Sequence, residues 1–439
     1  MVSKLSSDEV LSFLIIVSVI LITARVLGEV FRKFKQPAVI GEILAGILLG
    51  PSLLGTVAPH LFDSIFTAQK GVPYKAFDGL AQIGIILLMF IAGFEVDLKQ
   101  IRKQGKQAAS ISFMGLIFPF ALGFGAVWFF YDKIFSAPSN ISLTIPAMFF
   151  GTALSITALS VIAKILLDLD ILRSKIGNLV LTAAMIDDFL GWILFSIIMQ
   201  LMKPGEESAV WSVSMVLVYT VFILTIGRWV VDKILLIADK FLSIGGLITV
   251  SVALCLLSAV YTEYLGVRGI FGAFLMGVAI GDSKYFPERL QNILHQFVIN
   301  IIAPLFFASI GLRVNFVTNF NIEIVSIILI IACFAKLIGA GIGARMSGMS
   351  KNESYAVAFG MNSRGSQEIV LGTLALQAKI IDEPIFVGLV VMTVVTILIA
   401  GPLMKYYLAK HERSVKPVNA ESHVKIVSQP ESTQVAGVS

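Results

Sequence analysis

Apolar stretches follow one another along almost the whole chain and are separated by short polar connections. A membrane-spanning helix needs about 20 consecutive, mainly apolar residues. That length predicts about thirteen helices, near residues 9–31, 38–56, 77–94, 107–131, 142–167, 174–201, 209–237, 242–262, 265–283, 290–312, 323–347, 352–378 and 384–409. Residues 412–439 are polar and rich in Ser, Val and Gln, and we expect them to form a disordered cytoplasmic tail.

Composition supports this pattern. The 439 residues are 57% hydrophobic and only 14% charged, whereas a soluble domain carries about 25% charged residues. The sequence therefore predicts an all-α polytopic membrane protein, and its net charge of +5 bears on topology rather than on nucleic-acid binding. Two cysteines, both in apolar surroundings, indicate neither a disulfide framework nor a zinc site.

Basic residues decide the expected orientation. Lys and Arg gather in alternate connections, which places those connections in the cytoplasm under the positive-inside rule. The N-terminus is then outside and the C-terminus cytoplasmic, which requires an odd number of spans. Because the first apolar stretch follows Ser-Ser-Asp-Glu with no basic leader and no organelle-targeting segment, we expect a multi-pass protein of the cell (inner) membrane.

An odd number of spans also indicates an internal arrangement. If the helix near 209–237 is a linker, six spans precede it and six follow, and the two sets have opposite orientations. Inverted repeats of this kind are a transporter architecture, with the substrate site near the midplane where interrupted helices meet. The Gly-rich spans, by contrast, are explained most simply by close helix packing.

Four places put polar side chains inside these apolar stretches. The polar residues concerned are Ser155, Thr157, Asp187, Asp188, Lys336, Asn362, Arg364, Gln367 and Glu368. Asp187 lies about 12 residues beyond Lys175, which is about 18 Å along a helix and close to mid-membrane. Asn362 and Gly365 favour non-helical backbone, which predicts an unwound stretch there.

A structural role and a functional role are both open for these residues. An ionisable side chain at the centre of a membrane helix costs roughly 2.5–3.5 kcal/mol, so an Asp–Lys pair could fix helix packing. That role leaves the second aspartate unexplained. Arg364 and Glu368 are four residues apart and could pair along one helix. Ser155 and Thr157 could be ordinary back-bonded hydroxyls or could line a helix break.

Two carboxylates inside a membrane can also carry ions. A buried carboxylate prefers to be neutral or paired, and its oxygens can hold a proton or a hard monovalent cation, but not both together. If the site moves from one side of the membrane to the other only with a proton or a cation bound, this competition produces proton–cation antiport. Adjacent helix positions differ by about 100°, so Asp187 and Asp188 face different neighbours. Lys336 is a natural partner for one of them.

The chain resembles the monovalent cation:proton antiporter-2 family of sodium/proton and potassium/proton exchangers. The resemblance covers roughly residues 10–410. It rests on six segments in the expected order, QPAVIGEILAGILLGPSLLG, FIAGFEVDL, AMIDDFLGW, RGIFGAFLMGVAIGD, PLFFASIGLRVN and GMNSRGSQEIVL.

This resemblance implies a core domain with the ion site, a dimerisation domain, movement between the two domains and a homodimer. The corresponding ranges are a core near 107–201 and 323–409, a scaffold near 9–94 and 242–312, and the linker near 209–237. Two broken helices are implied around Ser155–Thr157 and Asn362–Gly365. By motif match, Asp188 is the cation ligand and Asp187 pairs with Lys336, which is typical of electrogenic carriers that move two protons per cation.

Two departures refine the expectation. Many relatives carry a regulatory nucleotide-binding domain after the last span, whereas only residues 412–439 follow here, so we expect none. The regulated potassium-efflux branch has Gln in place of Asp187, which favours Na⁺ over K⁺ or Li⁺.

No cofactor is expected. The alternative is a cation-coupled carrier of an organic anion, which would need Arg364 to face a cavity. An aspartyl protease, the enzyme considered, lacks its Gly-x-Gly-Asp motif.

Overall fold

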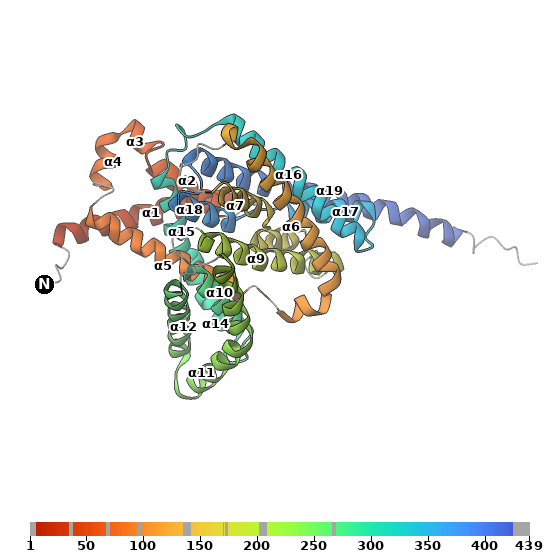
Figure 1. Ribbon diagram of the computed structural model, residues 1–439, viewed down its shortest axis with the longest axis horizontal. Coiled ribbons are helices and arrows are strands. Elements are labelled where there is room, and N and C mark those ends of the chain that lie inside the picture. The colour runs from red at the N-terminus through yellow and green to blue at the C-terminus, as the bar shows by residue number, and fades with distance from the viewer. Residues whose placement is uncertain are drawn as a thin grey trace, which may run out of the picture.

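In the computed structural model the chain is a bundle of helices, and no strand occurs in the part that it describes (Figure 1). That part comprises residues 6–34, 38–66, 71–94, 96, 98–134, 142–169, 171, 174–201, 209–265 and 269–424.

The helices before the linker are α1 Ser7–Lys33, α2 Ala38–Leu49, α3 Leu54–Val57, α4 Pro59–Ile65, α5 Val72–Phe94, α6 Leu98–Ile134, α7 Thr144–Ser155, α8 Leu159–Asp168 and α9 Lys175–Leu201. The linker region consists of α10 Ala209–Phe222, a π-helical turn η1 Ile223–Gly227 and α11 Arg228–Phe241. After it come α12 Ile244–Tyr264, α13 Gly269–Gly281, α14 Glu288–Phe297, η2 Val298–Ile302, α15 Ala303–Arg313, α16 Ile322–Met346, α17 Lys351–Met361, α18 Ser366–Gln377 and α19 Glu383–Val424.

Within the described residues, ten helical segments are long and apolar enough to cross a membrane. The polytopic all-α expectation is therefore confirmed, while the expected count of thirteen is not established. The three expected spans that fall short of this length are 142–167, 265–283 and 352–378. The first and last are each interrupted, giving α7 with α8 and α17 with α18, and the middle one is the 13-residue α13.

The C-terminal helix departs from the expected boundary. We expected a disordered tail from residue 412, but α19 continues through this point to Val424 and projects away from the bundle (Figure 1). Helical backbone thus replaces the first part of the expected tail, because no helix-breaking signal at residue 412 ends α19. The rest of the expected tail, 425–439, lies outside the described residues.

The helices form two groups, and within each group the helices pack against one another. In the first, α6 packs against α7, α9 and α16, and α17 packs against α16 and α19. In the second, α5 packs against α13 and α15, and α2 packs against α1 and α15. Every helix that carries a predicted intramembrane charge belongs to the first group or is continuous with it.

Small residues allow the closest contact within the first group. A Cβ added at Gly343 of α16 would lie 2.5 Å from the Ser110 carbonyl oxygen and 2.7 Å from Ile111 Cα, both on α6. Two residues earlier, a Cβ at Gly341 would meet only Ala358 Cβ, at 3.7 Å. The glycine-rich end of α16 therefore contacts α6 along one face, as expected for small residues at membrane helix interfaces.

We expect Gly343→Ala to lower the melting temperature of the purified protein in detergent, because α6 and α16 must separate to admit the methyl group. Overpacking of this kind costs about 1–3 kcal/mol. Gly341→Ala is the matched control on the same helix, and it should leave the melting temperature unchanged or raise it slightly. Equal melting temperatures for the two variants would contradict the packing described here.

Candidate functional site

The two interrupted helices meet at their breaks. Between α7 and α8, residues 156–158 are non-helical, and between α17 and α18 the break runs from Asn362 to Gly365. The backbone N–H of Ala158 donates to the Ser363 carbonyl at 3.0 Å. The Thr157 hydroxyl lies 2.7 Å from the Met361 carbonyl oxygen, at the end of α17. Segments about 200 residues apart in sequence thus satisfy each other's backbone groups.

Gly365 permits this approach. A Cβ at this position would lie 2.5 Å from Ala158 Cβ and 2.9 Å from a Val161 methyl carbon. The sequence predicted non-helical backbone at Gly365. The structure confirms this, since Gly365 is extended; because any residue adopts that conformation, glycine is required here by space rather than by backbone conformation.

Cationic side chains lie at the C-terminal end of α7, where carbonyl groups have no intrahelical partner. The guanidinium of Arg364 donates to the carbonyls of Ala153 at 3.2 Å, Leu154 at 2.5 Å and Ile156 at 3.0 Å. The ammonium of Lys336 donates to the Ser155 carbonyl. A helix C-terminus carries a partial negative charge of about half a unit, so both cations are well placed there.

Carboxylates lie at the opposite kind of helix end. At the start of α8, the backbone N–H of Leu159 donates to Asp188 Oδ2 at 3.3 Å. At the start of α18, the N–H of Gly365 donates to Glu368 Oε2 at 2.6 Å. Negative groups are stabilised at helix N-termini by the same macrodipole. All four charged side chains and both breaks therefore form one electrostatic unit.

Asp187 is held by a cluster of buried partners. Its Oδ2 lies 2.6 Å from Lys336 Nζ and 3.0 Å from the Thr157 hydroxyl, and both members of the ion pair are fully buried. Its Oδ1 accepts a hydrogen bond of 2.5 Å from the hydroxyl of Ser112 on α6. Asp187 thereby joins α9 to α6, to α16 and to the first helix break.

Asp188 faces a different set of groups, as the 100° step between adjacent helix positions predicts. Besides the Leu159 N–H, its Oδ2 accepts from the side-chain amide of Gln367 at 2.8 Å. Asp188 is 1% exposed. It is therefore a buried carboxylate between the N-terminus of α8 and the first turn of α18.

Several oxygen atoms near the second break have no hydrogen-bond partner within the described residues. They are Asn362 Oδ1, Ser363 Oγ, Gln367 Oε1 and Glu368 Oε1, and all four are buried. Carboxylate, amide and hydroxyl oxygens are the ligands that hard cations prefer. No group of three or more His, Cys, Asp or Glu that could hold a metal ion occurs in the described part of the chain. A cation here would thus need these neutral oxygens beside a carboxylate.

A family model described as "Sodium/hydrogen exchanger, transmembrane" matches residues 16–410. The chain belongs to this family. The expected resemblance to monovalent cation:proton antiporters is thereby confirmed, and the chain is a membrane protein of the cation/proton exchanger class.

Similar proteins agree with this assignment. The Na(+)/H(+) antiporter NhaS4 of Synechocystis sp. is 33% identical over 405 residues, which cover 91% of this chain and 98% of that protein. A Na(+)/H(+) antiporter of Enterococcus hirae is 29% identical, covering 91% and 99% of the two chains. The sodium proton antiporter MjNhaP1 from Methanocaldococcus jannaschii shares the fold, with a TM-score of 0.63 and 16% identity over 91% of this chain and 97% of that one. These relatives are transporters rather than enzymes.

In this exchanger, the structure brings the predicted site residues together at the two breaks. It does not show the alternative pairing of Arg364 with Glu368: no ion pair joins them among the described residues, and both bind backbone groups instead. Ser155 has both of its expected roles. Its hydroxyl donates back to the Gly151 carbonyl one turn earlier, at 2.6 Å, and its own carbonyl lies at the helix break, where it accepts from Lys336. Thr157 lines the break.

Sequence reasoning assigned no role to two side chains that contact the aspartates. Gln367 is visible in the polar motif, but only the fold shows that its amide reaches Asp188. Ser112 gives no signal, because a single serine in an apolar helix commonly bonds its own backbone. Its role depends on α6 packing against α9.

We expect Lys336→Met to destabilise the exchanger strongly, because it leaves the buried Asp187 carboxylate without its cation. Removing one partner of a buried pair costs about 3–5 kcal/mol. The double variant Lys336→Met with Asp187→Asn removes both charges and should melt at a higher temperature than Lys336→Met alone. Melting temperatures in detergent for the wild type, both single variants and the double variant would measure this. Strictly additive effects would contradict a direct interaction.

Proposed function

We propose that this exchanger is a secondary active antiporter that moves protons against a monovalent cation, with Na⁺ favoured over K⁺ or Li⁺, and that Asp188 carries the exchanged ion. The observation that carries the proposal is the position of Asp188. Its Oδ2 bonds Gln367 at one break and the Leu159 N–H at the other. The buried oxygens without a hydrogen-bond partner among the described residues, on Asn362, Ser363, Gln367 and Glu368, lie in or next to the second break.

Charge balance supports movement of loaded rather than empty states. The buried ionisable side chains at the two breaks are Asp187, Asp188, Glu368, Lys336 and Arg364. Three carboxylates and two cations leave one negative charge when all are ionised. One proton or one monovalent cation restores neutrality, and an uncompensated charge is costly in an apolar interior. Loaded states are therefore the ones that can move between the two sides.

The Lys336–Asp187 pair offers a second proton. Cation binding at Asp188 would add positive charge close to this pair and favour loss of the Lys336 proton. Release of that proton in addition to the one displaced from Asp188 gives two protons per cation and an electrogenic cycle, in which the cation-loaded site keeps one negative charge, one fewer than the empty site with a neutral Lys336. The buried 2.6 Å contact between Lys336 and Asp187 supports this assignment, since it couples the lysine to the same helix that carries Asp188.

Alternating access is assigned to movement of the core, 107–201 and 323–409, against the scaffold, 9–94 and 242–312, with the linker 209–237 between them. The packing of α6, α7, α9 and α16 on one another supports this division. The breaks support inverted repeats, because each interrupts the fifth expected span of its set of six. A homodimer in the cell membrane, with the N-terminus outside and the C-terminus cytoplasmic, completes the proposal.

The carrier of an organic anion is less well supported. That function requires a basic group facing a large cavity, and Arg364 was the candidate. Its guanidinium instead donates to three carbonyls at the end of α7 and is fully buried. Arg364 is thereby engaged in holding the first break.

We expect everted membrane vesicles that contain the protein and are acidified by respiration to become more alkaline when NaCl is added, with smaller responses to KCl and LiCl. In Asp188→Asn the response should fall to the level of vesicles without the protein, because an amide cannot exchange a proton for a cation. A fluorescent pH probe measures the response.

Asp239→Asn is the matched control, since Asp239 is an exposed residue of α11 far along the chain from both breaks. It should retain the wild-type response. Full exchange in Asp188→Asn would contradict the assigned site. No response to any of the three salts, with folded and abundant protein, would instead favour the organic-anion carrier.

We expect Lys336→Gln to change the stoichiometry from two protons per cation to one. In proteoliposomes with the membrane potential clamped at zero, a given sodium gradient is balanced by a pH gradient that stops net flux. This balancing pH gradient should be twice as large in Lys336→Gln as in the wild type. Lys336→Arg, which keeps the charge, is the comparison variant. An unchanged balancing gradient in Lys336→Gln would exclude the lysine as a proton carrier.

A further inference from the structure

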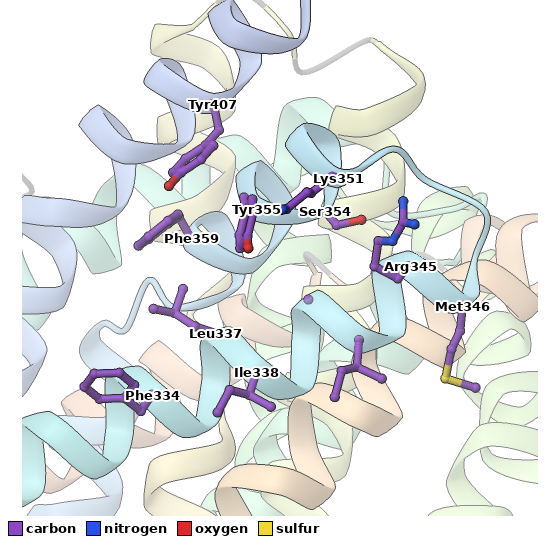
Figure 2. A pocket seen from close by; sticks show the side chains of 12 residues that line it. Phe334, Leu337, Ile338, Arg345, Met346, Lys351, Ser354, Tyr355, Phe359 and Tyr407 are labelled. Atoms are coloured by element: carbon purple, nitrogen blue, oxygen red, sulfur yellow. The ribbon is translucent and has the colours of Figure 1, made fainter.

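A hollow of about 630 Å³ opens between α16, α17 and α19 (Figure 2). Its volume lies within the range of about 300–1,000 Å³ that is usual for small-molecule sites. None of the residues assigned to ion exchange lines it. Its lining therefore takes part in no function assigned so far.

One wall of the hollow faces the surroundings of the bundle. Phe334, Ile338 and Ile342 of α16 are four residues apart in turn, so they form a single stripe, and their exposed fractions lie between 39% and 63%. Phe359 of α17 and Tyr407 of α19 form the opposite wall, with their rings stacked at 5.5 Å between centroids. In a protein that spans a membrane, an exposed apolar stripe beside such a hollow faces acyl chains.

The hollow is charged at one end only. Arg345 at the end of α16 and Lys351 at the start of α17 lie at that end, and Phe334 lies at the other (Figure 2). Both basic residues are exposed, and among the described residues no acidic side chain lines the hollow. The nearby carboxylate of Glu353 accepts from the Ser350 N–H at 2.7 Å and lies 3.6 Å from His411 Nε2, so it is engaged elsewhere.

These features fit one class of molecule. The positive-inside expectation puts Arg345 and Lys351 on the cytoplasmic side, where anionic headgroups attract basic residues beside membrane helices. A glycerophospholipid has the matching shape, with a negative phosphate at one end and apolar chains at the other. We infer that the hollow between α16, α17 and α19 binds an anionic phospholipid, with its headgroup at Arg345 and Lys351 and an acyl chain along Phe334, Ile338 and Ile342.

The test uses the full-length protein, purified in detergent and supplied with phosphatidylglycerol or phosphatidylcholine of identical acyl chains. Native mass spectrometry measures the lipid that stays bound. The wild type should retain phosphatidylglycerol in preference to phosphatidylcholine. Arg345→Gln with Lys351→Gln should weaken that preference about five-fold for each charge removed, since each basic residue near an anionic headgroup contributes about one kcal/mol.

A second variant tests the apolar end with both charges in place. Gly341 lines the hollow, and a side chain there meets little besides Ala358, so Gly341→Leu fills the space where the acyl chain would lie. It should reduce retention of phosphatidylglycerol as well. Lys284→Gln with Arg289→Gln is the charge-matched control at exposed positions between α13 and α14 and at the start of α14, and should retain the wild-type preference.

The outcomes separate cleanly. A weakened preference in the Arg345–Lys351 double variant and reduced retention of phosphatidylglycerol in Gly341→Leu, with the control unchanged, support the site. Equal retention of the two lipids by the wild type, or a preserved preference in the Arg345–Lys351 double variant, overturns it. A preference lost equally in the control variant also overturns it, because net charge alone would then explain the binding. None of these readouts depends on transport, so the proposed antiport can fail or hold independently.

Discussion

A helix that ends inside a membrane protein must satisfy its last carbonyls and first N–H groups without bulk water. This exchanger has four such ends at its two breaks; buried charges lie at three of them, and the Thr157 hydroxyl bonds the Met361 carbonyl at the fourth, the end of α17. Arg364 and Lys336 bind carbonyls at the end of α7, while Asp188 and Glu368 accept from N–H groups at the starts of α8 and α18. Each sign lies at the helix end of opposite partial charge. The whole site follows from that match.

The contacts of the aspartate pair support dividing a structural role and the proposed ion-exchange role between its two members. Asp187 has a cation, two hydroxyls and three neighbouring elements as partners, an arrangement that fixes packing. Asp188 accepts from an amide side chain and a helix N-terminus, groups that stabilise negative charge without transferring a proton of their own. In the proposed cycle, Asp187 thus holds the framework while Asp188 exchanges ions.

Much of this could be predicted from the sequence, because the signals are local. Asn362 and Gly365 marked one break, Ser155 and Thr157 the other, and the 100° step separated the faces of Asp187 and Asp188. Other features depend on tertiary contacts. Arg364 was four residues from Glu368, a spacing typical of a helical pair, yet it binds the end of a helix some 210 residues away in sequence. The length of α19 and the contribution of Ser112 also carried no local signal.

The same reasoning explains why the chain uses broken helices at all. A continuous helix has its backbone groups paired internally, so only side chains could offset the charge of a passing ion, and each would need its own buried counter-charge. Two interrupted helices supply partial charges of about half a unit at each end without any additional ionisable group. Those partial charges are fixed to the backbone, so in the proposed cycle they remain in place when a proton replaces a cation at Asp188. The site can therefore change its occupant while its electrostatic surroundings stay constant, and exchange of like charges requires that constancy.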